Sequence, residues 1–294
     1  QTCGRHRLTR PLAKRVCQLA TVEHFTRLPQ LMFDQHGVRL SHHEMLDLVQ
    51  DVGGAVDAQR RAEVEAWAQS VDKHWPAAEV TPRRVYVSVD GIMYCTNERE
   101  PHPDDPQRKR LQWQQMRIGC VYWQDEHEHW HKQMIWGREE AQAFGASLYR
   151  LACRCGYREA EEKLFAADGG EWCWSIHQQY FAAAQGILDW YHASEHAWDT
   201  ARVLHPDDDE ARRQWAAQAL TRLHDGGGCA LLEWLTTEWS HWRCRKRKAV
   251  TQLMAYIQPR LDRTDYPTYL AHGWQIGSGM IESTAKQLVG LRLK

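Results

Sequence analysis

A valine-rich stretch that runs directly into a carboxylate decides the fold: residues 85–91 read VYVSVDG. Every second residue of this stretch is valine, which is the period of a β-strand. Asp90 and Gly91 follow, and we expect them to end the strand because Asp-Gly commonly begins a turn. A charge at the end of a buried strand is unfavourable without a partner or a metal ion. Asp90 is therefore a candidate functional residue.

The same arrangement recurs downstream. Residues 164–170 read LFAADGG, a short apolar strand that ends in Asp168. Glu282 lies early in a helix that follows the glycine-rich turn 273–279. Brought together, Asp90, Asp168 and Glu282 would form an oxygen-rich, negative site suited to Mg²⁺ or Mn²⁺ rather than to zinc. Two such ions roughly 3.5–4 Å apart can promote phosphodiester transfer. The plainer interpretation is that each Asp-Gly pair only starts a turn.

The elements around these motifs predict an α/β fold. Strands are expected at 85–89, 111–124, 129–136, 164–167 and 187–188, with helices at 139–156 and 172–183. Residues 97–110 are polar, and we expect a loop there. From residue 193 to about 261 the pattern is helical throughout, which predicts a helical insertion at about 197–265 before the last helix.

The first part of the chain has a different character. Residues 1–78 are expected to be all helical, followed by a catalytic domain at 79–294. Gly37 interrupts the helical pattern and Ser41 caps the next helix, which is the outline of a helix-turn-helix and a candidate DNA contact. Residues 55–73, rich in Ala, Glu and Arg, predict a separate linking helix.

Composition indicates a folded protein. The 294 residues include 43% hydrophobic and 26% charged residues, with fifteen tryptophans. No apolar run is long enough to cross a bilayer, and the first residues do not resemble a signal peptide, so we expect a soluble, cytoplasmic protein. The nine cysteines show no disulfide framework and are expected to be reduced core residues.

The net charge of −1 argues against a nucleic-acid partner, but the cations are clustered. The first cluster consists of Arg5, Arg7, Arg10, Lys14 and Arg15. The second consists of Arg243, Arg245, Lys246, Arg247 and Lys248. The residues of the second cluster and Lys286 are the DNA-binding candidates, because lysine and arginine side chains bind phosphate groups. The alternative is that each cluster is a solvated helix face.

Four stretches together resemble a known family. They are VSVDG (87–91), FAADGGEW (165–172), ILDWYHASEH (187–196) and GSGMIES (277–283). In this order they are similar to the motifs of DDE transposases of bacterial insertion sequences, and most similar to the ISKra group. The resemblance covers about residues 10–294, and its last two motifs are the most specific.

The resemblance implies an RNase H-like domain in which Asp90, Asp168 and Glu282 form a catalytic, metal-binding triad with two Mg²⁺ or Mn²⁺ ions. Asp189 and His192 resemble the Asp-x-x-His pair of related transposases, and together with His196 they are secondary active-site candidates. The implied activity is hydrolysis and strand transfer at the ends of an insertion sequence in double-stranded DNA. Holding two ends implies a homodimer or higher, and the implied compartment is the bacterial cytoplasm, at the nucleoid.

Two other functions remain open. His192, Glu195 and His196 also fit the H-x-x-E-H motif of zinc peptidases, with Glu233 or Glu238 as a further ligand. A catalytically silent, domesticated DNA-binding protein is the other alternative. A last histidine group, His127, His129 and His131, would share one face of a strand; we expect an exposed strand edge rather than a metal site.

Overall fold

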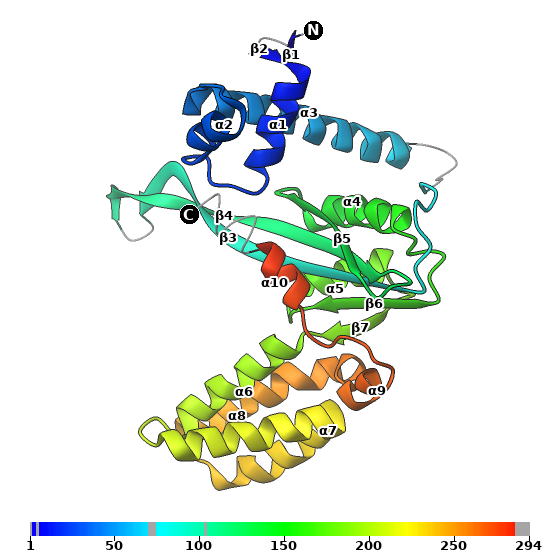
Figure 1. The fold of residues 1–294 in the computed structure, drawn as a ribbon. Helices are drawn as coiled ribbons and strands as arrows, with labels where there is room; N and C mark the ends of the chain where they lie inside the picture. Colours follow the sequence, from blue (N-terminus) through cyan, green and yellow to red (C-terminus); the bar gives the residue numbers. More distant parts are fainter. Residues whose placement is uncertain (1, 4–5, 70–74, 103–104, 286–294) are drawn as a thin grey trace. The chain divides into compact units, whose positions relative to one another are not determined.

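The computed structural model of the protein describes residues 2–3, 6–69, 75–102 and 105–285 (Figure 1). The chain divides into two compact units. Unit 1 takes in 1–75, 92–116 and 283–294, and unit 2 takes in 76–91 and 117–282. The division between residues 75 and 76 lies near the boundary suggested by the sequence, whereas residues 92–116 group with unit 1.

Three helices form most of unit 1: α1 (Arg10–Ala20), α2 (Leu28–His36) and α3 (His42–Gln69). Their facing sides enclose a small apolar core. Its buried members are Ala13, Val16, Leu19, Ala20, Leu28, Met32, Met45 and Leu48. These side chains recur at helical spacing, so burial of one face of each helix holds the group together.

The turn between α2 and α3 follows the sequence prediction. Gly37 ends α2 in the left-handed conformation with φ 63°, and its N–H donates to the Phe33 carbonyl at 2.8 Å. Ser41 and Glu44 then form a reciprocal cap at the start of α3: the Glu44 N–H donates to Ser41 Oγ at 3.2 Å, and the Ser41 N–H donates to Glu44 Oε2 at 2.9 Å. The structure thus has a helix, a turn at Gly37 and a second helix that Ser41 caps.

Two details of this region differ from the prediction. Residues Thr2–Cys3 (β1) and His6–Thr9 (β2) are short antiparallel strands, so the expectation of an all-helical start is wrong there. The first helix begins only after them, with Pro11 in its first turn. The separate linking helix at 55–73 is also wrong, because α3 runs unbroken to Gln69, and 70–74 lie outside the described residues.

A five-stranded sheet organises unit 2, in the order β5-β4-β3-β6-β7. The strands are β3 (Arg84–His102), β4 (Asp105–Gln124), β5 (Trp130–Gly137), β6 (Glu162–Ala167) and β7 (Gln185–Leu188). The β4–β5 pair is antiparallel, whereas β3–β6 and β6–β7 are parallel. A mixed open sheet with flanking helices confirms the predicted α/β class.

The polar loop predicted at 97–110 is wrong, because β3 and β4 extend through it as a long hairpin, of which 103–104 lie outside the described residues. Polar side chains pair across the two strands: Tyr94 with Gln114 at 3.0 Å, and Arg110 with Glu100 at 2.7 Å. These pairs satisfy groups that the sequence alone suggested were solvated. Neither do Asp90 and Gly91 end a strand, since β3 continues past them.

Both faces of the central strands are buried, as is usual for parallel strands. Figure 1 shows α4 (Ala141–Arg154) and α5 (Glu171–Tyr180) beside the sheet. The Phe165 ring packs there against Trp174 and His177 of α5. On the opposite face Tyr86 stacks on Tyr122 at 4.9 Å between ring centroids.

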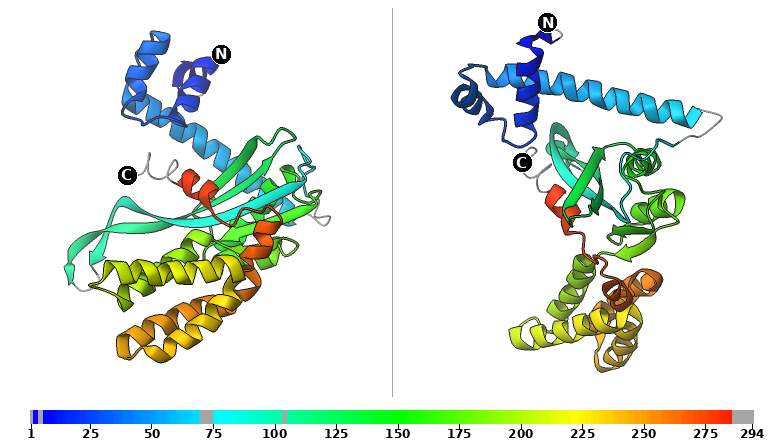
Figure 2. Two further views of the ribbon diagram at one scale, coloured as in Figure 1. Left: turned by 60° about the horizontal axis from the view of Figure 1, so that its bottom comes forward. Right: turned by 45° about the vertical axis from the view of Figure 1, so that its right-hand side comes forward.

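The chain between β7 and the last helix is helical, as predicted. It comprises α6 (Trp190–Leu204), α7 (Asp209–His241), α8 (Cys244–Ile257), a 3₁₀ turn (Gln258–Arg263) and α9 (Tyr266–Ala271). Figure 2 shows α6, α7 and α8 packed side by side. Gly227 kinks α7 with φ 68° and ψ −168°. The last helix, α10 (Gly279–Ala285), carries Glu282.

Within the described part of the chain, no helix has the length and apolar character required to cross a membrane.

Candidate functional site

Three aspartates align across neighbouring parallel strands: Asp90 lies within β3, and Asp168 and Asp189 come directly after β6 and β7. Val89 of β3 is paired with Ala167 of β6, which is paired with Leu188 of β7. Asp90, Asp168 and Asp189 each follow one of these paired residues, and so they continue the register on one face of the sheet. Because β6 lies between β3 and β7, Asp168 lies between Asp90 and Asp189. Adjacent strands are about 4.8 Å apart.

Glu282 is connected to this row through a serine of the glycine-rich turn. The Ser278 N–H donates to Asp189 Oδ1 at 2.6 Å, and Ser278 Oγ donates to Glu282 Oε1 at 3.3 Å. The Trp190 N–H also donates to the Ile276 carbonyl at 2.9 Å. These bonds fix the turn against the end of β7, so the helix that carries Glu282 begins beside the aspartates.

The surroundings of Asp90 disfavour its charged form. Burial raises the pKa of Asp90, the Gly91 N–H bond opposes this, and the charges of Asp168 and Glu282 raise the pKa further. The Gly91 N–H donates to Asp90 Oδ1 at 2.6 Å. A cation placed among these carboxylates would therefore relieve their mutual repulsion.

Asp168 is held by the loop that follows it. Its Oδ1 accepts the Gly170 N–H at 2.9 Å and the Cys173 thiol at 3.3 Å. Its backbone carbonyl accepts Trp174 Nε1–H at 2.8 Å. Arg260, more than ninety residues downstream, donates to the Gly169 carbonyl at 2.8 Å. The loop is thereby anchored to both α5 and the helical segment of unit 2.

Asp189 and His192 form an ion pair at the start of α6, in which Asp189 is buried and His192 is partly exposed. Asp189 has no exposed side-chain surface, and its Oδ2 accepts both His192 Nδ1–H at 2.7 Å and the His192 backbone N–H at 2.9 Å. The Asp189 hydrogen bond raises the pKa of His192 to about 9, against the effect of burial. Burial raises the pKa of Asp189, but the bonds from His192 and Ser278 outweigh it and lower that pKa. His192 is thus a cation at neutral pH.

The donor set fits a hard divalent cation in its chemistry, because Asp90, Asp168 and Glu282 supply only oxygen ligands. In the side-chain arrangement of the described residues, however, no three His, Cys, Asp or Glu side chains converge closely enough to hold a metal ion. The structure thus brings the three carboxylates into one electrostatic neighbourhood and does not place them as a preformed set of ligands.

The histidine motif of the peptidase alternative has other partners. His192 bonds to Asp189, while the His196 ring lies 3.7 Å from the Tyr256 ring, centroid to centroid. Burial lowers the pKa of His196. Glu238 Oε2 accepts the indole N–H of Trp215 at 2.9 Å. His192, His196 and Glu238 thus each contact a residue other than a metal ion.

The alternating histidines do not share a strand face, so that expectation is wrong. His127 and His129 lie in the turn before β5, which begins only at Trp130. The Asp125 carboxylate organises the turn, accepting the backbone N–H groups of both and His131 Nε2–H at 2.7 Å. The cluster is a capped hairpin turn on the surface.

The structure describes all residues of the second basic cluster but only some residues of the first. Arg243–Lys248 lie at the junction of α7 and α8. In the first cluster, Arg10, Lys14 and Arg15 lie on α1, whereas Arg5 lies outside the described residues and the Arg7 side chain is not described. The predicted DNA contact Lys286 also lies outside them.

The sequence did not single out Cys173, Arg260 or Ser278, which hold the aspartates in place. Ser278 lies in the motif GSGMIES, four residues before Glu282. At this spacing on a helix start, a contact between the two side chains was predictable. Cys173 follows Asp168 by five residues at the start of a helix, a weak signal. For Arg260 the sequence carries none, because its contact depends on how the helical segment packs.

No protein-family model matches this chain, and no curated protein matches it significantly in sequence.

Proposed function

We propose that the protein is a DDE-type transposase that hydrolyses a phosphodiester at the end of an insertion sequence and transfers the freed 3′-hydroxyl to target DNA. The observation that carries the proposal is the strand register that puts Asp90 and Asp168 side by side, with Glu282 joined to the same row. Three acidic residues far apart in sequence are thus near enough for the charges of Asp168 and Glu282 to act on Asp90.

The sheet supports the finer proposal of an RNase H-like fold. Its central strand β3 has β4 and β5 on one side and the parallel strands β6 and β7 on the other. Three strands, a helix, a strand, a helix and a strand follow one another along the chain before the helical segment. This order agrees with the resemblance noted from the motifs.

In this function Asp90, Asp168 and Glu282 would hold two Mg²⁺ or Mn²⁺ ions, which would supply a Lewis acid and an activated oxygen nucleophile. The chain itself provides rigid positioning. Gly170 and Cys173 fix the Asp168 carboxylate, and Ser278 links Glu282 to the buried Asp189. Positioning of this kind lowers the entropic cost of reaching the reactive geometry.

His192 contributes a positive charge beside the acidic row. Its imidazolium lowers the pKa of Asp90, and the Asp168 charge helps to keep His192 protonated. We assign it a positioning role: it holds Asp189, and through Asp189 the turn that carries Ser278.

The test is strand cleavage with Mg²⁺ by the wild type, by Asp90→Asn and by Asp168→Asn. Each substitution keeps the size of the side chain and removes its charge, so we expect cleavage to fall by at least about a hundredfold. Binding to the same DNA should change little. Asp207→Asn, at an exposed residue between α6 and α7, is the matched control and should cleave like the wild type.

Full cleavage by either site variant would contradict the assignment. Absence of cleavage by the wild type, with DNA binding intact, would favour a catalytically silent DNA-binding protein. Activity that requires zinc and acts on peptides would favour the histidine motif instead.

A further inference from the structure

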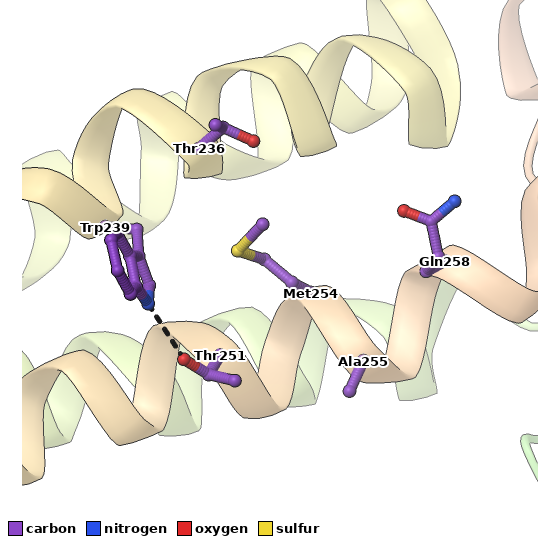
Figure 3. A pocket seen from close by; sticks show the side chains of 6 residues that line it. All are labelled: Thr236, Trp239, Thr251, Met254, Ala255 and Gln258. Atoms are coloured by element: carbon purple, nitrogen blue, oxygen red, sulfur yellow. Dashed lines mark hydrogen bonds between the residues drawn. The ribbon is translucent and has the colours of Figure 1, made fainter.

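A groove of about 370 Å³ lies between α7 and α8 in the helical segment of unit 2 (Figure 3). Its walls are mainly apolar. The lining residues are Thr236, Trp239, Thr251, Met254, Ala255 and Gln258. Its volume is in the range of sites that take small organic groups, and nothing in the proposed catalytic site uses it.

Trp239 is held rigidly at one end of this groove while remaining exposed. Its indole Nε1–H donates to Thr251 Oγ1 at 3.0 Å, and the Arg247 guanidinium carbon lies 4.1 Å from its ring centroid. The side chain is nevertheless 39% exposed. Figure 3 shows Met254 between Trp239 and Gln258, which stand at opposite ends of the groove. A fixed, exposed aromatic ring is a stacking platform.

The groove adjoins a concentration of positive charge. Arg243, Arg245, Lys246, Arg247 and Lys248 fall in six successive residues at the start of α8. None of them forms an ion pair with a carboxylate of the described residues, and the first turn of α8 contains no acidic residue. Cations at a helix N-terminus oppose the helix dipole, and an anion bound there would offset this repulsion.

The backbone at the same junction is strained. Cys244, the first residue of α8, has φ 48°, in the left-handed region that side chains rarely adopt. Strain of this kind persists at sites where the geometry serves binding. The backbone conformation of Cys244 sets the direction in which the chain turns from α7 into α8.

From these observations we infer that the groove binds one nucleobase of single-stranded DNA, stacked on Trp239, while the cations at the start of α8 bind the adjoining phosphates. A flat aromatic base matches the indole, and the Gln258 carboxamide offers both a donor and an acceptor for its edge. An apolar protein segment or a second copy of the chain would fill the groove without supplying an anion to Arg243, Arg245 and Lys248. This inference deepens the proposed function by naming a DNA contact outside the acidic row.

The experiment compares two short strands of equal length, a thymidine oligonucleotide and its abasic sugar-phosphate counterpart, by fluorescence anisotropy with the full-length protein in EDTA. Trp239→Ala should weaken binding of the thymidine strand by roughly 5- to 100-fold and leave binding of the abasic strand unchanged. Trp239→Phe should retain most of the affinity. Arg245→Gln with Lys248→Gln should weaken both strands and reduce the salt dependence of binding.

Trp136→Ala on β5 is the matched control, because that residue is also a well-exposed tryptophan, 48% exposed, on another element of unit 2. It should bind both strands like the wild type. Wild-type affinity of Trp239→Ala for the thymidine strand would overturn the inference, and so would equal losses on the two strands. A change in oligomeric state on substitution of Trp239 would show that the groove is an interface between copies.

Because the assay contains no divalent cation, its outcome does not depend on strand cleavage. A base-dependent loss in Trp239→Ala would stand even if Asp90 and Asp168 proved inactive. Conversely, the loss of cleavage in Asp168→Asn would stand if the groove bound no base.

Discussion

The pair formed by Asp189 and His192 shows how a single contact shapes the acidic row. Asp189 is fully buried and its two oxygens accept bonds from His192 and Ser278. Removing one partner of a buried, bonded charge leaves the other without compensation. The pair therefore couples the start of α6 to the turn that precedes Glu282, and its strength should depend on pH.

We predict that His192→Gln destabilises the protein by an amount that shrinks as pH rises. Folding raises the pKa of His192 from 6.5 to about 9, so the stabilisation is complete below about pH 6.5 and is lost as pH approaches and passes 9. The lowered pKa of Asp189 sets the other limit, since its contribution is lost only in acid. The effect should be modest, because His192 is 37% exposed and solvent screens the pair.

The measurement is the difference in Tm between wild type and His192→Gln from pH 6 to pH 10. His127→Gln, in the exposed turn before β5, is the control and should show little difference at any pH. A difference that stays constant or grows toward pH 10 would show that the imidazolium does not stabilise the fold.

Among individual residues, the sequence could identify those that end a regular pattern. Asp168 and Asp189 each follow a short apolar strand, and the structure puts both in the same register as Asp90. Arg260 could not be found this way, because its bond to the Gly169 carbonyl joins residues brought together only by packing. Side-chain convergence on a metal ion likewise depends on rotamers, about which the strand pattern carries no information.

At the scale of whole elements, the kink in α7 has a specific requirement. Gly227 adopts φ 68° and ψ −168°, a conformation essentially restricted to glycine. A Cβ atom at this position would lie 2.8 Å from the Thr264 carbonyl oxygen. The Gly228 N–H donates to that same oxygen at 3.2 Å. The kink thus lets α7 approach the segment that leads into α9.

We predict that Gly227→Ala lowers the free energy of unfolding by about 1–3 kcal/mol from backbone strain alone. The close approach to Thr264 would add to this. Gly54→Ala in α3 is the opposite control, because a Cβ there meets nothing within 4 Å and alanine favours the helix. It should stabilise the protein slightly in the same denaturant titration. Equal stability of Gly227→Ala and the wild type would mean that α7 can straighten without cost.

Helices and strands with a strong hydrophobic periodicity were predictable from the sequence, and strands that depend on pairing with a neighbouring strand were not. Residues 164–167 and 279–285 form the expected strand and helix. The hairpin arms at 97–110 were expected to be a loop because their residues are polar. Cross-strand bonds such as Arg110 to Glu100 compensate for that polarity, and such bonds depend on the partner strand rather than on local composition.

At the scale of the molecule, the two units have separate cores. The apolar side chains buried among α1, α2 and α3 all belong to residues 13–48. The buried strands of unit 2 draw their core from the sheet and its helices. A unit that contains its own core can keep its fold when a neighbouring one is removed, so the DNA contact expected of the first helices can be tested by removing them.

We predict that a chain beginning at Pro76 keeps the near-ultraviolet circular dichroism and cooperative unfolding of unit 2 but binds DNA with a weaker salt dependence. The deletion removes the α1 cations Arg10, Lys14 and Arg15, and the salt slope falls by about one for each phosphate that is no longer neutralised. The full-length triple variant with glutamine at these three positions is the matched control, and its slope should fall by nearly the same amount. A truncated chain that unfolds without cooperativity would show that unit 2 depends on the first helices. An unchanged slope in the triple variant would show that the α1 cations do not bind phosphates, and that the charge at the start of α8 carries the interaction with DNA.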